Sequence, residues 1–197
     1  MTFRELGDGL RVSSVGLGCM GFSHAYGAPT ERGEAIRMIR AAYDIGYTFF
    51  DTAETYGTES DPHDNEKLVG AALKDVRDNV QIVSKFGITF DQTSTAVNKP
   101  LIPDARRPDV IRASIEGTLT RLGTDHIDLY FQHRIDPTVE PETVAGVMAD
   151  LIREGKILHW GISEANEDYL RRAHAVCPVA AVENRYSMMA RQYEALF

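Results

Sequence analysis

A short apolar run followed by a longer amphipathic segment recurs along this chain, and this repeat constrains the fold more than any other feature. The short runs are rich in β-branched or aromatic residues, whereas the longer segments have the three- and four-residue apolar spacing of helices. The predicted strands span residues 13–20, 47–53, 80–87, 127–134, 157–163 and 179–187. Uniformly apolar strands separated by helices predict a parallel sheet covered by helices.

The connections between these elements are uneven in length. The predicted helices span residues 31–45, 65–73, 108–122, 141–154 and 166–175. Pro108 and Pro141 suit the first turns of the third and fourth helices. Residues 3–12, with Gly7 and Gly9 near their centre, predict a small hairpin that caps one end of the structure. Strand-to-helix connections are the longer ones, so the elaborated face lies at the C-terminal ends of the strands, where such folds gather their ligands.

Two parallel architectures fit this pattern. Gly16, Gly18 and Gly21 have the G-x-G-x-x-G spacing of a doubly wound, dinucleotide-binding sheet. That fingerprint needs a helix to begin at its last glycine, but residues 22–30, including Pro29, intervene before any helical pattern. A (β/α) barrel is the second architecture, and the residues at the strand ends favour it.

Four polar side chains follow successive predicted strands. Asp51 ends the second strand, Lys85 the third and His133 the fourth, while Tyr56 lies in the loop after the second. Each has a structural interpretation as well, as a turn cap, a surface charge, a core histidine or a packed loop residue. Their placement at one rim of a parallel sheet favours a shared catalytic site over four separate structural roles.

Charge and composition exclude several classes of function. A formal net charge of −8 disfavours binding to nucleic acid or to an anionic membrane. No apolar stretch reaches the roughly 20 residues of a membrane helix, and the first residues lack a signal-peptide core, so we expect a cytoplasmic protein. Cys19 and Cys177 lack metal or redox spacing and are expected to be reduced. The acidic loop with Asp61, His63 and Asp64 has no second ligand group to converge on it, so no metal is expected.

The strand-end residues lie in motifs by which the sequence resembles the aldo-keto reductase superfamily, in its bacterial-type branch. The motifs occur in the family's order along the whole chain: GLGCMGFS, FFDTAETYG with NEKLVGAAL, IVSKFG, RLGTDHIDLYFQHR, EGKILHWGIS and VENRYS. The resemblance implies a (β/α)8 barrel of the TIM type that reduces aldehydes or ketones to alcohols with NADPH, or with NADH as the alternative. The family's catalytic tetrad falls here on Asp51, Tyr56, Lys85 and His133.

The chemistry of these four groups suits that reaction. Hydride addition leaves negative charge on the carbonyl oxygen, so the site must deliver a proton there. A free phenol has a pKa of about 10, so Tyr56 is protonated at neutral pH and can donate. Lys85 is expected to stabilise tyrosinate by lowering the pKa of Tyr56, with Asp51 holding the lysine in place. A neutral His133 would orient the substrate carbonyl.

The resemblance also implies contacts to the nicotinamide half of the cofactor. These are Gly18, Cys19, Met20, Asp51, Ser163, Glu164 and Glu183. Gly18 to Met20 match the stretch beside the nicotinamide ribose, and Ser163 matches a group that binds the carboxamide. Glu164 replaces the usual asparagine and Glu183 replaces a common glutamine. Because an ionised glutamate only accepts hydrogen bonds, either the carboxamide is held in another way here or nicotinamide binding is weaker than usual. The third interpretation is that both glutamates are variants of the branch that still work.

The length of the chain is the largest departure from the family. A barrel of this type takes about 250 residues, whereas the sequence has 197. We expect residues 1–197 to form one partial barrel domain without the last βα units, and to self-associate through open sheet edges. In the family, the last βα units bind the rest of the nucleotide. The sequence therefore leaves two alternatives for this chain, active or inactive as a reductase. The functional alternatives are a reductase of small-molecule carbonyls and a non-catalytic barrel remnant that binds a nucleotide or a partner.

Overall fold

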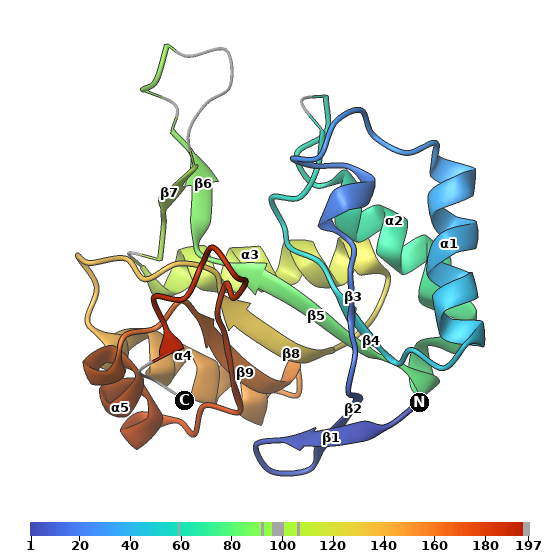
Figure 1. Cartoon of the computed structure of the whole chain (residues 1–197). Coiled ribbons are helices and arrows are strands. Elements are labelled where there is room, and N and C mark those ends of the chain that lie inside the picture. The colour runs from blue at the N-terminus through green and yellow to red at the C-terminus, as the bar shows by residue number, and fades with distance from the viewer. Residues whose placement is uncertain (59, 92, 96–100, 106, 195–197) are drawn as a thin grey trace.

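The computed structural model describes residues 1–58, 60–91, 93–95, 101–105 and 107–194. A curved sheet of six parallel strands lies at its centre, and the helices surround the outer side of this sheet (Figure 1). The strands are β3 (Leu17–Gly18), β4 (Phe49–Asp51), β5 (Gln81–Phe86), β8 (Ile127–Gln132), β9 (Ile157–Ser163) and β10 (Ala181–Glu183). The six strands lie side by side in the order in which they occur in the chain, β3-β4-β5-β8-β9-β10.

This strand order decides between the two architectures. A doubly wound sheet reverses its direction at a switch point, whereas the strands of a barrel follow one another around the wall. The structure is therefore an incomplete (β/α)8 barrel, as predicted, and not a doubly wound sheet. The glycine fingerprint lacks its helix, because Gly18 is followed by the short 3₁₀ helix η1 (Met20–Phe22) and the first α-helix begins only at Arg32.

The five predicted helices are confirmed with small shifts at their ends. They are α1 (Arg32–Asp44), α2 (Asp64–Leu73), α3 (Pro108–Leu122), α4 (Pro141–Arg153) and α5 (Glu167–Val176); the 3₁₀ helix η2 (Lys74–Asn79) extends α2. Local chemistry sets their limits. The Asn166 side chain accepts a hydrogen bond from the Tyr169 N–H at the start of α5. Gly123, with φ of 67°, ends α3 in the left-handed conformation that glycine adopts at low cost.

The predicted N-terminal hairpin is also confirmed, and it closes one end of the sheet. Strands β1 (Phe3–Leu6) and β2 (Leu10–Ser13) pair in antiparallel register. Leu10 and Val12 pack with Val83, Leu129 and Phe131, which line the inner face of the sheet. This small apolar cluster fills the N-terminal end of the barrel interior, so the site must lie at the opposite, C-terminal end.

Strand alternation separates the site from the main core. In β5, Ile82 and Phe86 join the large core between sheet and helices, whereas Val83 joins the inner cluster. Successive side chains of a strand point to opposite faces, so Lys85 shares the inner face with Val83. The same alternation places Asp51, Ser163 and Glu183 on this inner face, at the C-terminal ends of their strands.

The structure adds to the sequence prediction in the connection after β5. This connection was predicted only as a long one between a strand and a helix, with no strand assigned in it. In the structure, β6 (Ile88–Phe90) and β7 (Leu101–Pro103) pair as an antiparallel ribbon that projects above the rim (Figure 1). Each strand has three residues, too few for a clear alternation pattern. In the described ranges, no helix combines the length and the apolar composition needed to cross a membrane.

Candidate active site

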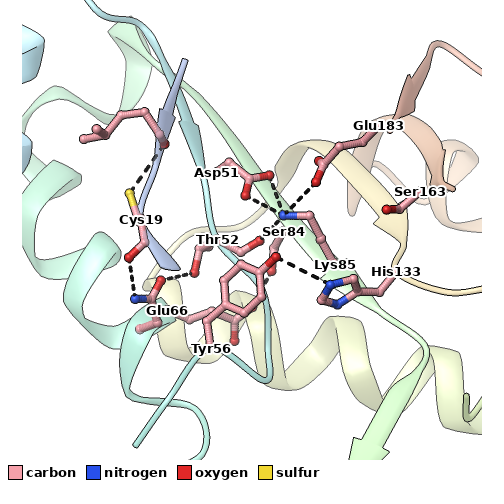
Figure 2. Close-up of polar contacts among 12 residues, drawn as sticks. Cys19, Asp51, Thr52, Tyr56, Glu66, Ser84, Lys85, His133, Ser163 and Glu183 are labelled. Carbon is pink, nitrogen blue, oxygen red and sulfur yellow. Dashed lines mark hydrogen bonds and ion pairs between the residues drawn. The ribbon is translucent and has the colours of Figure 1, made fainter. Parts of the chain in front are cut away.

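The four predicted catalytic side chains lie together at the C-terminal rim (Figure 2). Asp51 is the last residue of β4 and Lys85 the fifth of the six in β5. His133 directly follows β8, and its backbone N–H donates to the carbonyl of Phe86 in the neighbouring β5. Tyr56 comes from the loop after β4, so it is the one member of the tetrad whose position depends on a loop rather than on a strand.

Lys85 is the central charge of this group. Its side chain is fully buried, and Nζ donates to both carboxylate oxygens of Asp51, at 2.5 and 2.6 Å, and to the Thr52 carbonyl at 3.1 Å. Burial alone would lower the pKa of Lys85, but the negative charges of Asp51 and Glu183 raise it above its usual value. The ammonium therefore stays charged at neutral pH despite the loss of water.

Tyr56 lies between the lysine and the histidine. The Lys85 Nζ is 4.9 Å from the centre of the Tyr56 ring, and the phenol oxygen is 3.5 Å from Nε2 of His133. Burial raises the pKa of Tyr56; Lys85 lowers it in part, and Asp51 and Glu183 oppose the lysine. Lys85 lowers the pKa of Tyr56, as expected, but the net pKa is raised because burial and the two acids outweigh the lysine. The sequence showed neither the burial of Tyr56 nor the nearness of Glu183.

His133 is held as a neutral imidazole. Burial first, and then the positive charges of Lys85 and Arg134, lower the pKa of His133 to about 3. Its Nδ1 finds no hydrogen-bond partner among the described residues. An unpaired buried N–H is rarer than an unpaired acceptor, so the tautomer with hydrogen on Nε2 is favoured, and this N–H faces the phenol oxygen.

The residues implied for cofactor binding divide into two groups. Ser163 and Glu183 face the tetrad from the ends of β9 and β10 (Figure 2), and a Glu183 oxygen is 3.7 Å from the Lys85 Nζ. Burial first and then Asp51 raise the pKa of Glu183 to about 7, against the opposing effect of Lys85. Glu164 instead adopts a φ of 54° and directs its carboxylate to Arg134, 3.6 Å away.

The turn from Gly18 to Met20 borders the same site. Gly18 is exposed, and a Cβ added to it would meet nothing within 4 Å, so this stretch of backbone is open to a ligand. The N–H of Cys19 donates to the carbonyl of Asp51, which fixes the turn beside the tetrad. The Cys19 thiol is buried, and burial and Asp51 raise its pKa, so it is not a nucleophile.

Comparison with known proteins connects this geometry to a family. The model of the aldo/keto reductase family matches residues 14–197. A curated relative, the "Probable aldo-keto reductase 1" of Glycine max, is 41% identical over 191 residues, covering 95% of this chain and 51% of the relative. The chain belongs to the aldo-keto reductase family. It spans about half the length of this relative.

Solved aldo-keto reductases have the same fold. The thermostable aldo-keto reductase Tm1743, solved with the inhibitor epalrestat, matches 99% of this chain with a TM-score of 0.82 and 30% identity, over 66% of its own length. A glycerol dehydrogenase from Gluconobacter oxydans has a TM-score of 0.82 at 27% identity, and the chain covers 58% of it. The holo form of an aldo-keto reductase from Bacillus halodurans has a TM-score of 0.80 at 28% identity, with 61% of it covered.

This aldo-keto reductase chain also has buried acids that sequence reasoning missed. Glu66 of α2 is fully buried and accepts hydrogen bonds from Ser84 and Arg121 on the helix side of the sheet. Burial raises the pKa of Glu54 to about 7, although a hydrogen bond from Ser114 lowers it in part. In the sequence, the one indication that Glu66 is buried is that most of the residues following it in the helix are small or apolar.

In this aldo-keto reductase fold, the three side chains of the acidic loop considered for metal binding contact other residues of the protein. Asp61 pairs with Lys67 and Asp64 with Arg32. His63 Nδ1 contacts the Glu54 carbonyl oxygen. Each of these three side chains therefore has a partner within the protein.

Proposed function

We propose that this chain carries the catalytic half of an NAD(P)H-dependent carbonyl reductase site that converts aldehydes or ketones to alcohols. The observation that carries this proposal is the position of the Lys85 ammonium, which is bonded to Asp51 and lies 4.9 Å from the Tyr56 ring. A structural ion pair has no need of a phenol and a neutral imidazole at the same point. The family and its solved reductases support the same reaction class.

In the proposed reaction Tyr56 is the proton donor. Its raised pKa keeps the phenol protonated at neutral pH, which is the form that reduction needs. As the proton leaves, negative charge moves onto the tyrosine oxygen, and the neighbouring Lys85 ammonium stabilises that charge. The Nε2–H of neutral His133, 3.5 Å from the phenol oxygen, would donate to the substrate carbonyl and orient it.

The residues at the rim fit a nicotinamide carboxamide. The bound cofactor would supply the hydride for the carbonyl carbon. A carboxamide presents one acceptor and two donors. The Ser163 hydroxyl can donate to its oxygen, and a carboxyl oxygen of Glu183 can accept from its nitrogen. We assign the open backbone at Gly18, Cys19 and Met20 to the ribose side. NADPH is the proposed cofactor, with NADH as the alternative. We propose alcohol oxidation as the reverse reaction, because one structural relative is a glycerol dehydrogenase.

The first test is turnover. Incubation with NADPH or NADH and a panel of aliphatic and aromatic aldehydes is expected to consume reduced nicotinamide, measured as loss of its absorbance, and to form the alcohol in equal amount. Nucleotide binding, measured in parallel by fluorescence, separates two outcomes. Binding without consumption with any aldehyde would support the non-catalytic barrel remnant and contradict the reductase.

We further propose that the chain self-associates through the edges of its sheet. Strands β3 and β10 are the outermost of the six, and each has one neighbour among the described strands. Free strand edges pair readily with other chains, and Val182 of β10 is 37% exposed. Sedimentation velocity is expected to show a mean mass that rises with concentration, and less so in Val182→Lys. A sharp monomer over a hundredfold concentration range, roughly 1 to 100 μM, would exclude this mode.

A further inference from the structure

Asn65 joins three segments around the candidate site. It lies in the first turn of α2 and is fully buried. Its Nδ2 donates to the Cys19 carbonyl at 2.9 Å and to the Ser23 hydroxyl at 2.6 Å, while its Oδ1 accepts from the Thr52 hydroxyl at 2.6 Å. Because a backbone carbonyl only accepts, the contact with Cys19 fixes which end of the amide is nitrogen.

Ser23 extends this connection to the tyrosine. Its hydroxyl accepts from Asn65 and donates to the Tyr56 carbonyl at 2.6 Å, and the residue is 6% exposed. The path from Thr52 through Asn65 and Ser23 therefore returns to Tyr56. It closes a hydrogen-bonded ring around the loop that begins where β4 ends.

The next residue supports the loop at a second point. The His24 Nδ1 is 3.1 Å from the Gly57 carbonyl oxygen, so this nitrogen carries the hydrogen. The His24 ring also lies nearly parallel to the Tyr56 ring, with centroids 6.2 Å apart and 21° between the planes. The segment after β3 thus contacts both the backbone and the ring of the tyrosine.

We propose that Asn65 and Ser23 are positioning residues that fix the Tyr56 phenol relative to Lys85 and to the Cys19–Met20 turn. This rests on the function proposed above, in which Tyr56 donates the proton and the turn borders the cofactor. Neither residue touches the reacting atoms. Their role follows from topology, because Lys85 and Asp51 are placed by strands whereas Tyr56 is on a loop and needs separate support.

The chain offers a matched control for the Ser23→Ala variant. Ser13 is also buried, with 1% exposure, and its hydroxyl donates to the Val15 carbonyl at 2.8 Å. It exchanges two further hydrogen bonds with Thr48, just before β4 and thus at the N-terminal end of the sheet. Ser23→Ala and Ser13→Ala each remove one buried hydroxyl that donates to a backbone carbonyl, so both should lower the unfolding midpoint by similar amounts.

Two readouts distinguish positioning from stability. The first is the ¹³C resonance of the Tyr56 phenol carbon, identified by its absence in Tyr56→Phe; we expect Ser23→Ala to shift or broaden it and Ser13→Ala to leave it unchanged. The second is turnover, in which Ser23→Ala should lower kcat by about 10-fold, with KM for the aldehyde changed less than about twofold. Ser23→Thr, which keeps the hydroxyl, should restore both.

Equal effects of Ser23→Ala and Ser13→Ala on the tyrosine resonance and on kcat would overturn the positioning role. If the unaltered protein has no turnover, the proposed function fails, and the resonance comparison alone decides whether the ring of hydrogen bonds positions Tyr56. If Ser23→Ala does not fold, Ser23→Cys provides the same comparison, because the thiol keeps the volume and donates only weakly.

Discussion

Lys85→Met is expected to abolish most carbonyl reduction, by a factor of about 10² to 10⁴, and to destabilise the fold by about 3 kcal/mol. Methionine keeps most of the side-chain volume but removes the charge. The partly buried Asp51 carboxylate then loses its cation, and Tyr56 loses the group that stabilises tyrosinate. Reduced-nicotinamide consumption measures the first effect, and urea unfolding measures the second.

The pH dependence of this loss tests its cause. The pKa of Lys85 is raised in the folded state, so its stabilising effect is complete at neutral pH and is lost only in strongly alkaline solution. In Lys85→Met the penalty comes from uncompensated carboxylates, so it should be smaller near about pH 5 than near about pH 8. Lys67→Met, which removes the partner of Asp61 at the surface, should cost much less at either pH. An equal penalty in both variants would contradict the assigned role.

Tyr56→Phe is expected to lower kcat for aldehyde reduction by about 10² to 10⁴, with KM changed only a few-fold. Phenylalanine keeps the ring against Lys85 and His133, so the stability of the fold should change little. Only the proton donor is lost. Steady-state kinetics across several aldehydes would measure this separation of kcat from KM.

A second tyrosine serves as the control. Tyr169 of α5 is buried, and its hydroxyl donates to Gln132 at 3.0 Å on the helix side of the sheet. Tyr169→Phe therefore removes a buried phenol hydrogen bond without touching the tetrad, and turnover should persist. Retention of more than about a tenth of the activity in Tyr56→Phe would show that another group delivers the proton.

The elements of this fold were predictable because their signals are local. Pro108 and Pro141 mark helix starts, Gly7 and Gly9 mark a hairpin, and apolar runs mark the strands. The ribbon of β6 and β7 was missed because three-residue strands do not display a period, and their pairing joins residues more than ten positions apart. The G-x-G-x-x-G spacing was ambiguous because such glycines bind a dinucleotide only where an α-helix begins at the last of them, and here the first α-helix begins at Arg32.

The convergence of the four polar side chains was predictable, but the electrostatics around them were not. Period-two alternation places Asp51 and Lys85 on one face, and the order of parallel strands brings His133 to the same rim. No sequence pattern indicates that Glu183 lies 3.7 Å from Lys85, or that burial outweighs the lysine in setting the pKa of Tyr56. The hydrogen-bonded ring through Asn65 and Ser23 was equally invisible, because its partners are 13 to 46 positions apart.

By itself, the sequence determined the βα repeat and the end of the sheet at which four polar side chains come together. These features depend on periodicity and on the position of each residue within its own strand or loop. Only the tertiary structure decided that the strands follow one another around a curved sheet and that Glu183 lies beside the lysine. It also decided that Ser23, which is bonded to Asn65, donates to the Tyr56 carbonyl. The reason is physical: burial, charge and hydrogen bonding depend on distances between residues far apart in the chain, and those distances exist only after folding.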